Sequence, residues 1–298
     1  MNSFINSQGF GTIGMMTVLL GAIANIILDP IFIFTLHMGV QGAALATILS
    51  QLLSAVWIVK FLTGSKAILR LRTSAFRLKK QRVKDIVALG MSGFTMAITN
   101  SSVQIMYNAS LQHYGGDLYV GIMTVINSIR EIISMPVNGL TNSAQPVMGF
   151  NYGAGEYKRV KRAIVFISVV SIAYTTVMWL FVHGFPEFFI RIFNQDADLV
   201  REGIPAMRIY YFGFFMMSLQ FAGQSVFVAL GKAKNAVFFS IFRKVIIVIP
   251  LMLLLPLMFG LGTDGVLMAE PVSNFIGGAA CFITMLITVW PELSGKKK

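Results

Sequence analysis

One acidic residue lies deep within the first apolar segment of the chain, where it could carry ion chemistry. Asp29 falls inside residues 11–35, a stretch long enough to cross a bilayer. A carboxylate at membrane depth is costly, so it usually faces a wet cavity and marks an ion or proton pathway. Asn25 lies four residues earlier, on the same face of a helix. The pattern predicts a cation site, and the alternative is a buried Asp that bonds to its neighbours.

Pro30 follows this acid directly and is expected to bend the helix, because proline has no backbone N–H to donate. The carbonyl oxygen that loses its partner there can act as an ion ligand. Pro136, in a later apolar segment, is expected to kink its own helix for the same reason.

The composition predicts a polytopic membrane protein. Of the 298 residues, 56% are hydrophobic and only 12% are charged. The net charge of +12 does not indicate a nucleic-acid partner, because the basic residues cluster between apolar segments, as topology signals do. Cys281 is the one cysteine, so neither an internal disulfide nor a thiolate metal site is expected.

The apolar segments predict an all-α protein with eight transmembrane helices. They cover about 11–35, 40–62, 86–112, 118–143, 161–183, 203–230, 237–259 and 264–290. The basic residues of 66–84, 158–162, 232–244 and 296–298 are assigned to one side of the membrane, with Arg243 and Lys244 among them. The positive-inside rule then predicts that both termini are cytoplasmic and that the protein lies in the cytoplasmic membrane.

A short internal repeat links the first two segments to the last two. Residues 39–47 follow Pro30 in the pattern in which residues 262–270 follow Pro250, and Gly9 has a counterpart in Gly231. Parallel repeats of this kind occur in secondary transporters. The repeat predicts that residues 1–62 are the last two helices of an N-terminal lobe that lacks its first four. Residues 63–85 are then a basic cytoplasmic linker, and residues 86–298 are a complete six-helix lobe.

Polar residues recur at helical spacing in four of the apolar segments. They are Asn100, Gln104, Tyr107 and Asn108; Asn127, Glu131, Ser134 and Asn138; Gln220 and Gln224; and Glu270 and Asn274. Together they predict an aqueous substrate cavity, and the alternative for any one stripe is hydrogen bonding between helices. Arg130 lies about 100° round the helix from Glu131, and this pair is expected to tie helices together.

No arrangement typical of an enzyme is found, and no cofactor is expected. The glycine-rich residues 149–155 are not followed by the Lys-Ser/Thr of a nucleotide-binding loop. Without a nucleotide site, uphill transport would have to use an ion gradient.

Three segments resemble a known family. They are GLTNSAQPVMGFNYGAG at 139–155 with Tyr157, Arg159, Val160 and Arg162 after it, Asn25-x-x-x-Asp29-Pro30, and the glycine-rich residues 39–47. This set resembles the multidrug and toxic compound extrusion (MATE) family over essentially the whole chain. The resemblance implies part of a fold of twelve helices in two lobes, and export of organic cations and drugs in exchange for Na⁺ or H⁺.

The resemblance also implies a cation-coupling site at Asn25, Asp29 and Thr47, which could hold Na⁺. A further acid, which some members carry on their first helix, has no counterpart here. The expected partners are therefore small organic cations and the lipid bilayer, with a separate polypeptide as one possible source of the missing helices.

Two alternatives to a multidrug antiporter remain at this point. The first is a flippase for lipid-linked oligosaccharides, which a basic cavity would favour, but Arg130 is the one basic residue that is expected at mid-membrane. The second is a fragment that does not transport by itself.

Overall fold

The computed structural model describes residues 1–71 and 79–294, except for the side chains of residues 85, 88, 89, 92 and 259. Arg72 and Arg77 of the predicted linker, and the three terminal lysines, lie outside the described residues. The chain divides into two compact units, Met1–Val83 and Lys84–Lys298, called here the first and second units. Every regular element in the described part is a helix, which confirms the predicted all-α class.

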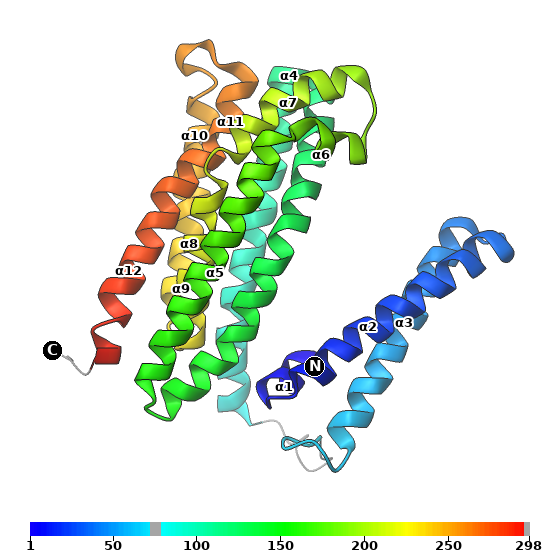
Figure 1. The fold of residues 1–298 in the computed structure, drawn as a ribbon, viewed down its shortest axis with the longest axis vertical. Helices are drawn as coiled ribbons and strands as arrows, with labels where there is room; N and C mark the ends of the chain where they lie inside the picture. Colours follow the sequence, from blue (N-terminus) through cyan, green and yellow to red (C-terminus); the bar gives the residue numbers. More distant parts are fainter. Residues whose placement is uncertain (72–78, 295–298) are drawn as a thin grey trace. The chain divides into compact units, whose positions relative to one another are not determined.

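The first unit is a pair of long helices with a short helix before it. It contains α1 (Asn2–Ser7), α2 (Gly11–Pro30), the π-helix η1 (Ile31–Thr35) and α3 (Gly39–Thr63), and α2 and α3 run in opposite directions (Figure 1). Small residues allow these two helices to approach closely. The Ser54 hydroxyl donates to the Thr17 carbonyl at 3.1 Å, and a Cβ atom at Gly21 would lie 2.4 Å from Ser54 Oγ.

The second unit is a bundle of long helices. Its elements are α4 (Lys80–Gly153), which begins before the unit boundary, then α5 (Tyr157–Gly184), α6 (Pro186–Phe193), α7 (Ala197–Tyr211), α8 (Phe214–Ala229), α9 (Ala233–Ile241), η3 (Phe242–Val248), α10 (Ile249–Leu254), η4 (Met258–Gly260), α11 (Gly262–Ser273), η5 (Asn274–Gly278), α12 (Ala279–Val289) and η6 (Glu292–Ser294). Among these, η3 and η5 are π-helices. The Tyr211 hydroxyl donates to the Ile126 carbonyl at 3.1 Å and so joins α7 to α4 inside the core.

The helix α4 consists of two arms that meet at Gly116. Gly116 has φ 66° and ψ −163°, and it is the one residue of α4 whose dihedral angles are not helical. Positive φ favours glycine, because a Cβ atom would be strained there. Figure 1 shows the two arms side by side in the second unit. The backbone continues through Pro136 with helical dihedral angles, so the kink expected there stays a prediction.

The count of membrane spans also stays a prediction. By length and apolar composition, the described residues contain six helices that could cross a membrane, or seven when the bent pair α7 and α8 is taken as one span. One of the six is the range Gly93–Gly153, which contains the turn at Gly116. The prediction of eight spans treats this range as two spans, one that ends at residue 112 and one that begins at residue 118. Its third span was predicted to begin at residue 86, whereas α4 begins at Lys80.

The internal repeat reappears in the backbone of the two units. Gly9 and Gly231 have φ of 88° and 73°, and Gly39 and Gly262 have φ of 54° and 49°. The next glycine of each copy packs against a backbone. A Cβ atom at Gly42 would lie 2.8 Å from the carbonyl of Phe32, and one at Gly265 would lie 2.6 Å from the nitrogen of Pro256. The aligned glycines therefore serve the same purpose in both copies.

The glycine-rich segment 149–155 covers the end of α4 and the start of the turn to α5. Gly153 ends α4, and Gly155 has φ of 76°, which reverses the chain. The backbone N–H of Glu156 donates to the Asn151 carbonyl at 2.8 Å and so closes the turn. These glycines have a structural role at the end of a helix and do not form a phosphate loop.

Candidate functional site

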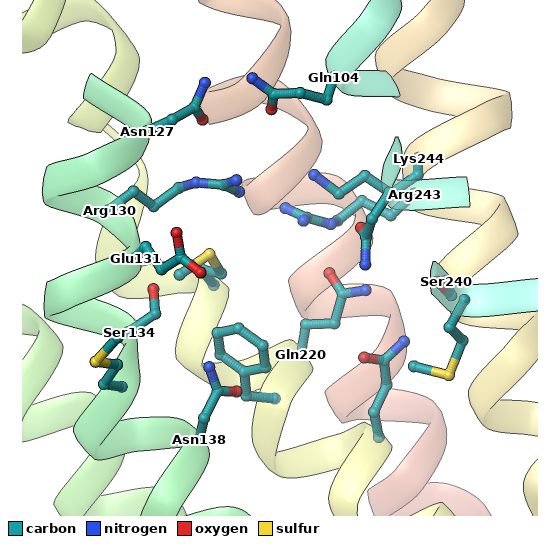
Figure 2. Close-up of a pocket in the computed structure, with 16 residues that line it drawn as sticks. Gln104, Asn127, Arg130, Glu131, Ser134, Asn138, Gln220, Ser240, Arg243 and Lys244 are labelled. Atoms are coloured by element: carbon teal, nitrogen blue, oxygen red, sulfur yellow. The ribbon is translucent and has the colours of Figure 1, made fainter. Parts of the chain in front are cut away.

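A polar cavity of about 630 Å³ lies among the helices of the second unit (Figure 2). Both arms of α4, together with α8, α9 and η3, form its wall. The lining residues are Met96, Asn100, Gln104, Asn127, Arg130, Glu131, Ser134, Met135, Asn138, Met217, Gln220, Phe221, Gln224, Ser240, Arg243 and Lys244. Eight of the twelve polar residues that predict the cavity are among them: Asn100, Gln104, Asn127, Glu131, Ser134, Asn138, Gln220 and Gln224. Helical spacing brings the polar residues of α8 and of the second arm of α4 to one face of each helix, and these faces line the cavity.

The other four, Tyr107, Asn108, Glu270 and Asn274, lie outside this lining. Tyr107 is buried in the core of the second unit, where its ring meets the ring of Tyr210 at 6.3 Å. Glu270 and Asn274 are buried behind the wall, in α11 and at the start of η5. They contact the residues of η3 that do line the cavity.

Two of the three basic residues at this site were not predicted from the sequence. Sequence analysis places Arg243 and Lys244 with the basic residues of the connecting segment 232–244; their placement in a connection is wrong, and the cytoplasmic side of that segment stays a prediction. Both residues lie in η3, line the cavity and are only 5% and 7% exposed. A signal was present, because the pair interrupts an apolar segment that continues to residue 254. The wide turns of a π-helix, which are frequent at functional sites, place both side chains on the inner side.

One carboxylate is shared by these two cations. Glu270 Oε1 accepts from Arg243 Nη1 at 3.3 Å and from Lys244 Nζ at 3.3 Å. Arg243 also donates to Asn274 Oδ1. Glu270 and Asn274 are 1% and 2% exposed, so the cluster is shielded from solvent. A close approach makes this possible: a Cβ atom at Gly277 would lie 2.6 Å from Cγ of Arg243.

Arg130 faces the same cavity from the second arm of α4. In the described part of the chain it has no hydrogen bond and no ion pair. Glu131, next to it in the sequence, is exposed on the same wall and makes no ion pair with a described residue. The expectation that Arg130 and Glu131 tie helices together as a pair therefore finds no contact here.

Several buried polar atoms at or near the cavity also lack a hydrogen-bond partner among the described residues. They are both amide atoms of Asn127, Gln220 Oε1, Arg243 Nε, the Tyr107 hydroxyl and Asn108 Oδ1. A buried polar group without a partner costs about 1–3 kcal/mol. The cavity thus offers donors and acceptors that a ligand could satisfy.

The predicted cation site lies in the first unit. Asn25 and Asp29 are half-buried one turn apart in α2, and Asn25 Nδ2 and Asp29 Oδ1 are buried without a partner in the described residues. Thr47 is exposed in α3, and its hydroxyl donates to the Ala43 carbonyl at 2.9 Å. An unsatisfied carboxylate oxygen suits a proton or a cation. The described residues contain no group of three His, Cys, Asp or Glu side chains that could hold a metal ion.

Comparisons with known proteins agree with the fold. The MatE family model matches residues 92–254. The multidrug export protein MepA of Staphylococcus aureus strain MSSA476 is 25% identical over 294 residues, which are 97% of this chain and 62% of that protein. The solved structure of MATE in the straight conformation has a TM-score of 0.89 at 21% identity and covers 98% of this chain and 65% of its own.

The structure of MATE in the bent conformation gives a TM-score of 0.86 at 21% identity, and the match covers 97% of this chain and 63% of that one. The chain thus spans less than two thirds of the length of these relatives.

Proposed function

Because this chain belongs to the MatE family, we propose that it takes part in the export of small organic molecules across the cytoplasmic membrane. The observation that carries this proposal is the polar cavity of about 630 Å³ inside a bundle of apolar helices. That volume lies in the range of small-molecule sites, about 300–1,000 Å³. Family members are transporters and not enzymes, and the relatives named multidrug export protein support the proposed activity.

The same proposal makes Asp29 the residue that couples export to a Na⁺ or H⁺ gradient. Asn25 supplies an amide one turn away, and Thr47 is the third residue implied by the family pattern. Support comes from the unpaired Asp29 Oδ1 in an apolar helix, at the point where α2 gives way to the π-helix η1. Binding of a cation there would favour one form of this helix over another and so couple ion occupancy to export.

Organic cations are part of the proposed cargo because Glu131 lines the cavity as an exposed carboxylate. Methionine and phenylalanine side chains on the same wall suit varied aromatic ligands. The proposal also keeps the predicted division into residues 1–62, 63–85 and 86–298, with both termini in the cytoplasm. A separate polypeptide that supplies further helices remains part of the proposal.

The test is the Asp29→Asn variant, which keeps the shape of the side chain but removes its charge. Ethidium efflux is measured in cells that produce the full-length protein, with membrane abundance followed by immunoblotting. Efflux is expected to fall to background while abundance stays unchanged. The matched control is Asp198→Asn, since Asp198 is exposed and pairs only with nearby Arg201 at 3.3 Å in the described structure. Unchanged efflux in Asp29→Asn would reject the coupling role.

A further inference from the structure

The cavity wall of the second unit carries more positive than negative charge. Arg130, Arg243 and Lys244 line it, against Glu131 as the lining carboxylate. Figure 2 shows Arg130 extending from one side and the Arg243 and Lys244 side chains extending from the other, toward the same space. Even with Glu270 behind the wall included, three cations face two carboxylates.

Glu270 cannot neutralise both of its partners. A single carboxylate is shared between Arg243 and Lys244, with both contacts near the long end of hydrogen-bond distance at 3.3 Å. Asn274 adds a neutral acceptor, and Arg243 Nε still has no partner in the described residues. One carboxylate therefore serves two basic side chains beside the cavity.

Arg130 adds a third cationic side chain, which makes no ion pair with a described residue. Its guanidinium group has five N–H donors, and none of them makes a hydrogen bond to a described residue. A buried charge without a partner is costly in a region of low dielectric constant, both in protein interiors and in membranes. An anion between half-buried Arg130 and the Arg243–Lys244 pair would supply a partner to both sides of the cavity.

We infer that the cavity binds ligands that carry a carboxylate or phosphate group, with the acidic group placed between Arg130 and the Arg243–Lys244 pair. The planar fork of arginine matches the two oxygens of such a group. This inference rests on the proposed export function. It extends that function by adding molecules with an acidic group to the organic cations already proposed as cargo.

The rest of the wall suits the remainder of such a ligand. Met96, Met135, Met217 and Phe221 offer apolar surface for a flat body. The unpaired amide groups of Asn127 and Gln220 offer neutral hydrogen bonds. Glu131 lies on the same wall and can hold a cationic group, so zwitterions with an acid at one end and an amine at the other fit the cavity best.

Binding of three matched compounds to the purified full chain in lipid nanodiscs tests the inference. The compounds are naphthalene-2-carboxylate, naphthalene-2-carboxamide and 2-naphthylmethylammonium, which differ in the charge of one group. Isothermal titration calorimetry, with empty nanodiscs subtracted, gives each dissociation constant. The carboxylate is expected to bind about tenfold or more tightly than the carboxamide, since charge-assisted hydrogen bonds are roughly twice as strong as neutral ones.

The Arg130→Gln variant is expected to reduce this preference to about twofold or less, and Arg130→Lys is expected to restore part of it because the charge returns without the fork. Arg130 has no described ion pair to lose, so the variant should fold, which size-exclusion chromatography checks. Arg191→Gln is the matched control, because Arg191 is exposed and pairs with Glu187 at 2.8 Å, away from the cavity residues. Equal binding of carboxylate and carboxamide to the unmodified chain would overturn the inference, as would an unchanged preference in Arg130→Gln.

Farnesyl phosphate distinguishes a lipid source of the acidic group from a soluble one. Displacement of naphthalene-2-carboxylate by this lipid at lower concentrations than by phenyl phosphate would assign the site to a lipid phosphate, and the reverse order would assign it to soluble cargo. Either order supports an acid-binding site when it depends on Arg130. The result is also separable from the export proposal: a chain that exports ethidium but shows no carboxylate preference contradicts the inference alone. A chain that binds carboxylate but exports nothing contradicts the export function alone.

Discussion

Arg243 lies across Gly277 so closely that a Cβ atom on that glycine would meet three carbons of the arginine side chain, at 2.6–2.9 Å. Arg243 belongs to η3 and Gly277 to η5, so two π-helices meet at this point. The glycine leaves the space through which the guanidinium group reaches Glu270 and Asn274.

Replacing Gly277 by alanine is therefore expected to displace Arg243. Overpacking of this kind costs about 1–3 kcal/mol, and the shifted guanidinium group should also weaken carboxylate binding at the cavity. Thermal unfolding of the purified protein and the calorimetric titration measure the two effects. Gly139→Ala is the control, since nothing lies within 4 Å of a Cβ atom at that position. Equal stability and equal binding in both variants would show that the contact with Arg243 is unimportant.

Loss of Glu270 is expected to be severe. The Glu270→Gln change leaves Arg243 and Lys244 buried without their shared anion, and removal of one partner from a buried ion pair costs about 3–5 kcal/mol. The yield of folded protein in size-exclusion chromatography should fall sharply.

The Lys244→Met change should be milder, because Glu270 keeps Arg243 as its partner. Combining Glu270→Gln with Lys244→Met should recover part of the lost yield, since one of the two orphaned cations is removed. A double variant that is no better than Glu270→Gln would mean that the carboxylate acts through something other than charge balance.

The two copies of the internal repeat should respond alike to substitution. Gly42→Ala and Gly265→Ala each bring a Cβ atom within 2.8 Å of backbone atoms that cannot move aside easily. Both variants are expected to lower the thermal unfolding temperature by several degrees, as a loss of about 1–3 kcal/mol implies. Gly139→Ala should be neutral or slightly stabilising, because alanine is the better helix former. A large effect in one copy but not in the other would contradict the equivalence of the repeats.

Orientation in the membrane is testable with single cysteines. Cys281 is buried and is first replaced by serine. Lys158→Cys lies in the basic first turn of α5, and Gln195→Cys lies between α6 and α7; both positions are exposed. The positive-inside rule predicts that a maleimide that cannot cross membranes labels residue 195 in intact cells, and labels residue 158 only after permeabilisation. The opposite pattern would reverse the proposed topology.

The cavity could be predicted in large part because polar side chains in an apolar helix are conspicuous. Asn100, Gln104, Asn127, Glu131 and Gln220 all stood out in this way and line the cavity. Tyr107 shares the spacing of its stripe, but it lies in the hydrophobic core. The aromatic ring of tyrosine is largely apolar and is stabilised by burial, so a polar hydroxyl alone does not predict contact with water.

Arg243 and Lys244 escaped prediction for a different reason. They follow Lys232 and Lys234 closely in the sequence, and a mean hydropathy cannot show whether an arginine and a lysine further along the chain still lie in water. Their partner, Glu270, lies more than 25 residues away on another helix. Whether a charged side chain can be buried depends on such a partner. Only the packing of α11 against η3 brings Glu270 into contact with Arg243 and Lys244.

Local features were thus available from the chain alone. Helix formation follows from the length of each apolar segment, because a helix satisfies its own backbone hydrogen bonds. The turns at Gly9, Gly39, Gly231 and Gly262 follow from the conformations that glycine alone adopts at little cost. The tertiary structure decided the charge of the cavity, because ion pairing and burial depend on side chains from helices that are distant in the sequence.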